Sequence, residues 1–241
     1  MQQSKYSIIS SFLLCIGLIL GGFFPGYYYY LTKFNNNTVT VKGLAEQNVT
    51  ADLAIWKLKL ITTDNNLDIA QQLIQNQTKE TISFLKTIGF NDNEINTSPT
   101  DTQDTLASPY RNNEQNSPRF ILSQTITIKS NNVDLVEKSI PKTDTLIAKG
   151  IVFDNSYGDT ISYIFTKLNE IKPQMLEQAT KNALKSAQEF AKNSNSKVGK
   201  IKHANQGVFT ILSRDNLSNI LETEQKEKTI RVVTTIEYWL E

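Results

Sequence analysis

The segment ADLAIWKLKLIT, residues 51–62, is decisive for the fold class because its apolar side chains recur at every second position. One face of this segment carries Ala54, Trp56, Leu58 and Leu60. The lysines between them fall on the other face, and such alternation predicts a β-strand with one buried and one solvated side. Residues 38–44 alternate in the same way. A turn near residues 46–48 would join the two segments as a β-hairpin.

Helical periodicity follows this strand directly. Asp64 or Asn65 is a suitable N-cap, apolar residues then recur at helical spacing to about Thr87, and Gly89 is a suitable end. A second long helix is expected from Pro173, as a first-turn residue, to about Ala191. The inward stripe of that helix is expected to be Met175, Ala179, Ala183, Ala187 and Phe190.

Further strands and helices are expected between and after these two helices. Strands are expected over residues 93–104, 119–129, 161–168, 200–211 and 229–240, and a helix capped by Asn132 is expected to break at Pro141 and end at Gly150. The stretch 105–118 is interpreted as an exposed loop, and the polar stretch 213–228 as a mobile loop. Long helices between strand pairs predict an α+β fold with an antiparallel or mixed sheet.

The N-terminal segment differs in character from the rest of the chain. Residues 8–24 carry no charge, and the uncharged run continues to Lys33, which is long enough to cross a bilayer core of about 30 Å. We therefore predict a cytoplasmic N-terminus over residues 1–7, a transmembrane signal anchor over 8–31, a linker over 32–37 and a single domain over 38–241. Lys5 favours a cytoplasmic start, and Tyr27 to Tyr30 suit an interface. A cleaved signal peptide is the alternative, although the segment lacks a good cleavage site.

Composition excludes several classes of protein. Lys plus Arg is 25 and Asp plus Glu is 24, a net charge of +1, which argues against a non-specific nucleic-acid binder. One cysteine excludes an internal disulfide framework, and one histidine excludes a multi-histidine metal site. Cys15 lies in the predicted anchor, so the exported part would contain no thiol.

Few residues are candidates for chemistry. His203 is interpreted as a surface or edge histidine, because no nucleophile and acid accompany it. Two loops contain pairs of aspartates that could act as acid and base or bind Ca²⁺, namely Asp101, Asp104, Asp154 and Asp159. Asp52 is interpreted as a turn cap, Trp56 as core, Trp239 as partly exposed, and residues 205–207 as a tight turn or bulge. The sequence predicts no catalytic, cofactor-binding or metal-binding residue.

Several ordered segments together carry a family resemblance. They are TVTVKGLA (38–45), ADLAIW (51–56), KPQML (172–176), ATKNA (179–183), FA (190–191), KVG (197–199), ANQG (204–207) and RVVTTIEY (231–238). The chain resembles the SIMPL-domain family, in a membrane-anchored branch related to periplasmic immunogenic and channel-forming envelope proteins. The resemblance implies an α+β fold with a small sheet backed by long helices, and some relatives are reported to form hollow rings. It implies no catalytic residues.

The functional expectation is a non-enzymatic, self-associating envelope module without cofactors. It would be a homo-oligomer held in the bacterial inner membrane by residues 8–31, with its domain in the periplasm and a link to envelope stress. Secretion to the periplasm after signal cleavage is the alternative localisation. A binding module for an envelope component or small ligand is one alternative function. A hydrolase that uses the aspartate loops is the other.

Overall fold

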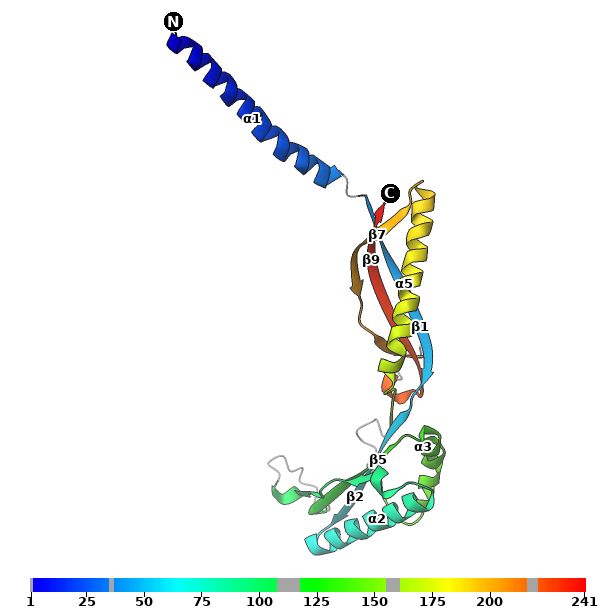
Figure 1. The fold of residues 1–241 in the computed structure, drawn as a ribbon. Helices are drawn as coiled ribbons and strands as arrows, with labels where there is room; N and C mark the ends of the chain where they lie inside the picture. Colours follow the sequence, from blue (N-terminus) through cyan, green and yellow to red (C-terminus); the bar gives the residue numbers. More distant parts are fainter. Residues whose placement is uncertain (1, 35–36, 108–117, 155–160, 216–220) are drawn as a thin grey trace. The chain divides into compact units, whose positions relative to one another are not determined.

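A computed structural model describes residues 2–34, 37–107, 118–154, 161–215 and 221–241, with the side chains of residues 2–13 and 31–34 left out of the description. The described residues have a mixed α+β architecture (Figure 1). The chain divides into two compact units. Unit 1 comprises residues 1–45, 176–208 and 232–241, and unit 2 comprises residues 46–175 and 209–231. The predicted domain 38–241 thus contains two compact units, and the divisions fall inside two long strands, inside one helix and in the segment between residues 206 and 210.

Unit 2 is built on a five-stranded sheet, here called sheet B. β2 (Leu53–Asp64) pairs antiparallel with β5 (Phe120–Ser130) and with β6 (Ile161–Ile164), while β5 also pairs with β3 (Ile95–Thr97) and β4 (Asp101–Asp104). The alternation expected in residues 51–62 is confirmed, because Ala54, Trp56, Leu58 and Leu60 are buried.

α2 (Leu67–Thr87) covers the apolar face of sheet B and shares one core with it (Figure 1). The side-chain oxygen of Asn66 accepts a hydrogen bond from the Asp68 amide at 2.8 Å, so the N-cap lies one residue beyond the predicted Asn65. Gly89 adopts a φ of +114° just after the helix, a conformation that favours glycine and confirms the predicted end. The core residues of α2 are Ala70, Ile74, Thr78, Thr81 and Leu85.

Short helices complete unit 2. α3 (Val133–Ser139) is capped by Asn132, as expected, and gives way at Pro141 to a 3₁₀ turn (Ile140–Thr143) and then α4 (Asp144–Ile147). Gly150 has a φ of +84° after this helix. Further 3₁₀ turns lie at Asp92–Glu94, Thr105–Ala107 and Glu222–Glu224.

A second antiparallel sheet, here called sheet A, has the strand order β1-β9-β7, with β8 also paired to β9. Its strands are β1 (Thr38–Thr50), β7 (Val198–Gln206), β8 (Thr210–Ser213) and β9 (Glu227–Leu240). In unit 1, α5 (Leu168–Asn193) lies along this sheet, and its alanines pack against β1 and β9 (Figure 1). The core of unit 1 includes Val41, Ala183, Ala187, Ile236 and Tyr238.

The predicted hairpin of residues 38–44 with 51–62 is wrong. β1 continues through residues 46–48 to Thr50, and it pairs with β9, whereas β2 lies in sheet B. The physical reason is that Glu46 to Asn48 contain no glycine to support a tight turn, while β9 offers an apolar face under the same helix.

Two details of α5 also differ from expectation. The helix begins at Leu168, so Pro173 lies inside it and not in its first turn. Met175, Ala179, Ala183 and Ala187 are buried as predicted, but Phe190 is 62% exposed and Ala191 takes the inward position. The inward row continues in a step of four from Ala187 to Ala191, and Phe190 lies beside this row on the solvent side.

α1 (Gln2–Phe34) covers the predicted anchor and the first residues of the predicted linker. Among the residues that the structure describes, no helix is both long enough and apolar enough to cross a membrane. The expected loop 105–118 lies largely outside the described residues, as does Asp159 in the second aspartate loop.

Candidate functional site

His203 lies on β7 and is exposed, as the sequence predicted. Its direct neighbour across the strand pair is Glu237 on β9. A hydrogen bond from the Thr38 hydroxyl, followed by one from Lys202, holds the pKa of the Glu237 carboxyl below its ordinary value. The carboxylate therefore stays ionised, which makes it an ion-pair partner and a poor general acid.

Lys202 joins this carboxylate to an aromatic ring. Its Nζ lies 3.1 Å from Oε1 of Glu237 and 4.7 Å from the centroid of the Trp239 ring. Trp239 is partly buried, as expected, and the lysine shields one face of it. This arrangement is a polar and aromatic surface on sheet A without a nucleophile poised for reaction.

The aspartates of the two loops are held in separate ion pairs. Arg119 lies 3.1 Å from Asp104, and Lys59 lies 2.8 Å from Asp154. Asp104 is on β4, next to β5, whereas Asp154 is hydrogen-bonded to β2 on the opposite side of the β5–β2 pair. Three strand spacings of about 4.8 Å separate them, so they do not form a catalytic pair. Asp101 is exposed on β4.

Asp52 has a structural role that differs from the expected cap of its own turn. Its carboxylate accepts hydrogen bonds from the amide and the hydroxyl of Thr166, at 2.7 Å and 2.8 Å. The residue therefore fastens the segment after β6 to the start of β2.

Two lysines that the sequence did not suggest as candidates lie in defined ion pairs in the structure. Lys228 is fully buried, and its ammonium is paired with the carboxylate of Glu222 and also donates to the Glu222 carbonyl at 2.7 Å. Lys228 shares the strand parity of Ile230 and Val232, and this parity was the signal that it faces inward. The interpretation of residues 213–228 as a mobile polar loop is therefore wrong at its end, where β9 begins at Glu227 and Lys228 is buried.

Lys226 lies between the carboxylates of Asp134 and Glu137 on α3. These hydrogen bonds raise the pKa of Lys226, and the lysine in turn lowers the pKa of Asp134. Both effects stabilise the charged forms of the two side chains, so these ion pairs hold the segment before β9 against α3.

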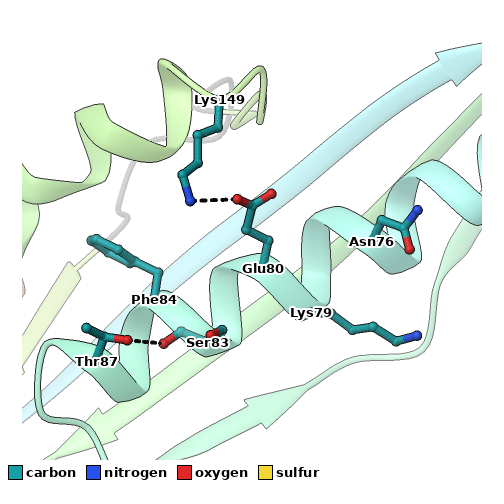
Figure 2. Close-up of a pocket in the computed structure, with 7 residues that line it drawn as sticks. All are labelled: Asn76, Lys79, Glu80, Ser83, Phe84, Thr87 and Lys149. Atoms are coloured by element: carbon teal, nitrogen blue, oxygen red, sulfur yellow. Dashed lines mark hydrogen bonds and ion pairs between the residues drawn. The ribbon is translucent and has the colours of Figure 1, made fainter.

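An open hollow of about 560 Å³ lies along α2 beside the end of α4 (Figure 2). Lys149 Nζ lies 2.7 Å from Glu80 Oε1 at its edge, and the Thr87 hydroxyl donates to the Ser83 carbonyl at 2.9 Å. Phe84 supplies a ring, and Figure 2 shows Lys79 directed away from Lys149. The lining residues are Asn76, Lys79, Glu80, Ser83, Phe84, Thr87 and Lys149.

The remaining candidates have structural explanations. Trp56 is 2% exposed and packs 6.4 Å from Phe90, ring centroid to ring centroid, so the core interpretation is confirmed. Asn205 and Gln206 continue β7 opposite Thr235 and Thr234, so they form neither a tight turn nor a bulge. Within the described residues, no three His, Cys, Asp or Glu side chains are grouped to hold a metal ion.

Comparison with known protein families identifies the family of this chain. The SIMPL model, described as "Protein of unknown function (DUF541)", matches residues 39–238. The chain belongs to the SIMPL family. The resemblance to the SIMPL family is thereby confirmed, and the SIMPL match spans parts of both compact units. No curated protein matches this SIMPL chain. The family description names no enzymatic activity.

Proposed function

We propose that this SIMPL protein is a membrane-anchored module that self-associates outside the cytoplasm and has no enzymatic activity of its own. Its place would be the bacterial inner membrane, crossed once, with the folded part in the periplasm. It would then belong to a membrane-anchored branch of the family, and envelope stress is the process to which we propose to link it. The observation that carries self-association is the exposed edge strand β7.

The support for the anchor comes from the sequence of α1. No charged residue occurs between Lys5 and Lys33, and α1 runs from Gln2 to Phe34 at 1.5 Å per residue. A helix of this length exceeds the thickness of a bilayer core, about 30 Å. The side chains described in it are exposed, including Leu18, Ile19 and Phe23.

The anchor is tested by extracting membranes from cells that express the full chain. Wild-type protein is expected to stay in the membrane pellet after alkaline carbonate. Ile16→Arg combined with Leu20→Arg is expected to release it, because each central arginine costs about 3 kcal/mol on insertion scales. Thr40→Arg is the control. Wild-type protein in the soluble fraction with an intact N-terminus would contradict the anchor, and an N-terminus beginning after residue 24 would establish the cleaved alternative.

Support for self-association comes from the edges of sheet A. β1 and β7 are the two ends of its strand order, and every residue of β7 from Lys200 to Gln206 is exposed. An unpaired edge presents backbone donors and acceptors that another strand can satisfy. Because the two edges are unlike, association of β1 in one copy with β7 in the next is head-to-tail and can close into a ring.

Light scattering of the detergent-solubilised full chain over a range of concentrations tests this association. Wild-type protein is expected to form oligomers. Ile201→Lys, at a 52% exposed position on β7, is expected to shift them toward monomers by adding a charge to the edge. Ile69→Lys on α2, at a 47% exposed position, is the matched control. A wild-type chain that stays monomeric throughout contradicts the proposal.

The hollow along α2 favours a binding module as the second candidate. Its volume falls in the range of small-ligand sites, about 300–1,000 Å³, and its lining combines one aromatic ring with amide, hydroxyl and charged groups. A polar small molecule would suit it. Thermal-shift screening of the full chain tests this, with Phe84→Ala expected to abolish any ligand-dependent shift and Thr40→Ala expected to keep it. The hydrolase alternative gains no such support, since Asp104 and Asp154 occupy separate ion pairs.

A further inference from the structure

One end of sheet A lies close in sequence to the end of α1. Asn37 is the first described residue after α1, and its carbonyl accepts a hydrogen bond from the Leu240 amide at 2.8 Å. Lys197 and Glu241 exchange two backbone hydrogen bonds at the same end, at 2.7 Å and 2.8 Å. We call this region, where residues 37, 197, 240 and 241 meet, the Asn37 end of sheet A.

The connection from α1 to this end is short. Phe34 is the last residue of α1, and Thr38 is the first residue of β1. Four residue steps span at most about 14 Å when fully extended. If α1 is inserted in a bilayer, the Asn37 end therefore stays within reach of the lipid headgroups.

The side chains at this end include two aromatic rings, one exposed and one partly buried. Phe190, in the last turn of α5, is 62% exposed, and α5 leads through residues 194–197 directly into β7. Trp239 is partly buried, one residue before Leu240, with the Lys202 ammonium 4.7 Å from its ring centroid. Aromatic side chains and lysine together suit the membrane interface, where a ring meets the headgroup layer and the ammonium group stays in water.

Lysines also gather at this end. Lys192, Lys197 and Lys200 are exposed, and none of them takes part in an ion pair among the described residues. The carboxylates nearby are Glu189, Glu237 and Glu241, of which Glu237 is paired with Lys202. Unpaired ammonium groups on long stems favour an anionic lipid surface over water.

We propose that the Asn37 end of sheet A is a lipid-contact surface, with Phe190 and Trp239 in the headgroup layer of an anionic bilayer and Lys192, Lys197 and Lys200 on its phosphates. The inference rests on the membrane anchor proposed above. The occupant of this surface is the bilayer in which α1 is inserted, so the folded part is docked on the membrane and does not swing freely on its tether.

Tryptophan fluorescence tests the proposal, because the chain has only two tryptophans and Trp56 is buried in unit 2. The full-length protein is reconstituted into vesicles of phosphatidylcholine and phosphatidylglycerol, with and without brominated acyl chains. We expect the brominated lipids to quench wild-type emission, and we expect this quenching to be lost in Trp239→Phe. Emission that is not quenched in wild-type protein overturns the proposal.

The anchor is measured in the same samples through Cys15, the only cysteine. A nitroxide attached there reports how deeply Cys15 lies in the bilayer, and this depth is measured independently of the position of the Asn37 end. A Cys15 label in the bilayer with unquenched Trp239 overturns the lipid-contact surface and leaves the anchor intact. A Cys15 label in water overturns both.

The lysines are tested separately by charge removal. Lys197→Gln with Lys200→Gln is expected to reduce Trp239 quenching in vesicles that contain phosphatidylglycerol and to leave the Cys15 depth unchanged. Lys138→Gln with Lys142→Gln, two exposed positions in unit 2, is the matched control. Equal quenching in the wild type and in both double variants would show that Lys197 and Lys200 do not contribute to lipid contact.

Discussion

At the scale of single residues, Gly43 shows how closely α5 approaches β1. A Cβ atom at this position would lie 1.9 Å from the carbonyl oxygen of Ala179 and 2.7 Å from the amide nitrogen of Ala183. Both contacts are with backbone atoms, which cannot turn aside as a side chain can. Asn182 adds a hydrogen bond of 2.7 Å to the Leu44 carbonyl beside this contact. Glycine at 43 is therefore required by the separation of helix and strand.

Gly43→Ala is expected to destabilise unit 1. The restricted unfolded chain would favour alanine by about 0.5–1 kcal/mol, but overpacking costs about 3 kcal/mol, so a net loss of about 2 kcal/mol is expected. Urea unfolding of the detergent-solubilised chain measures it. Thr40→Ala, at an exposed position of the same strand, should leave the midpoint nearly unchanged. Equal midpoints for the wild type and Gly43→Ala would show that α5 can move away at little cost.

Asp134 predicts a pH dependence of stability. Lys226 lowers the pKa of this carboxyl in the folded chain from 3.8, first through a hydrogen bond and then through its charge. The stabilisation is thus fully present above the unfolded value and is lost as the pH falls through the lower folded value. Wild type and Asp134→Asn should differ in urea midpoint at pH 7, and the difference should narrow as the pH falls below 3.8. A difference that does not narrow would assign the effect to something other than charge.

At the scale of elements, the small residues of α5 determine how it packs. Met175, Ala179, Ala183, Ala187 and Ala191 are each at most 2% exposed, and they recur every four residues along one face. Alanine at these positions permits the close contact that Gly43 completes on β1. The same helix leaves Phe190 exposed, because Ala191 and not Phe190 holds the inward position at this turn.

Ala187→Leu and Phe190→Ala are expected to have opposite consequences for this helix. The added atoms at the buried position should cost about 1–3 kcal/mol through overpacking. Loss of the exposed ring should change the free energy of unfolding by about 0.5 kcal/mol or less. Thermal unfolding of the two variants in detergent, compared with wild type, provides the measurement. A larger loss of stability for Phe190→Ala than for Ala187→Leu would indicate that the ring is in the core, which would contradict the packing described.

At the scale of the whole molecule, each compact unit has its own hydrophobic cluster. The core of unit 2 joins sheet B to α2, α3 and α4, and the core of unit 1 joins β1, α5 and β9. No buried residue belongs to both clusters. The chain nevertheless passes from one unit to the other within β1, α5 and β9, so neither unit is a continuous stretch of sequence.

Separate cores predict separate local stability. Ile74→Ala leaves a cavity in unit 2 that should cost about 2–5 kcal/mol. Hydrogen exchange in the full chain should then become faster in β5 than it does in residues 232–238 of β9. Ala187→Leu should show the reverse pattern. If both variants accelerate exchange equally in both units, the two cores unfold as one cooperative body.

Local sequence patterns predicted many of the helices and strands. Strands were expected at the positions of β2, β5 and β9, and the apolar face expected for β2 is the buried one. The caps Asn132 and Gly89 and the alanine stripe of α5 were also evident, since each depends on residues close in sequence. The arrangement of the polar candidates could not be predicted in this way. Whether Asp104 and Asp154 lie close together depends on strand order, and local spacing in the sequence does not encode that order.

The sequence by itself determined the family, the α+β class and the faces that are buried. Only the tertiary structure decided that β1 pairs with β9 and not with β2, that Asp52 binds the segment after β6, and that Lys228 is buried with Glu222. In the first two cases, the strand partners and the hydrogen-bonded residues lie more than a hundred positions apart. Periodicity reports which side of an element is apolar, whereas the choice of neighbour depends on how all the apolar faces can be buried at once.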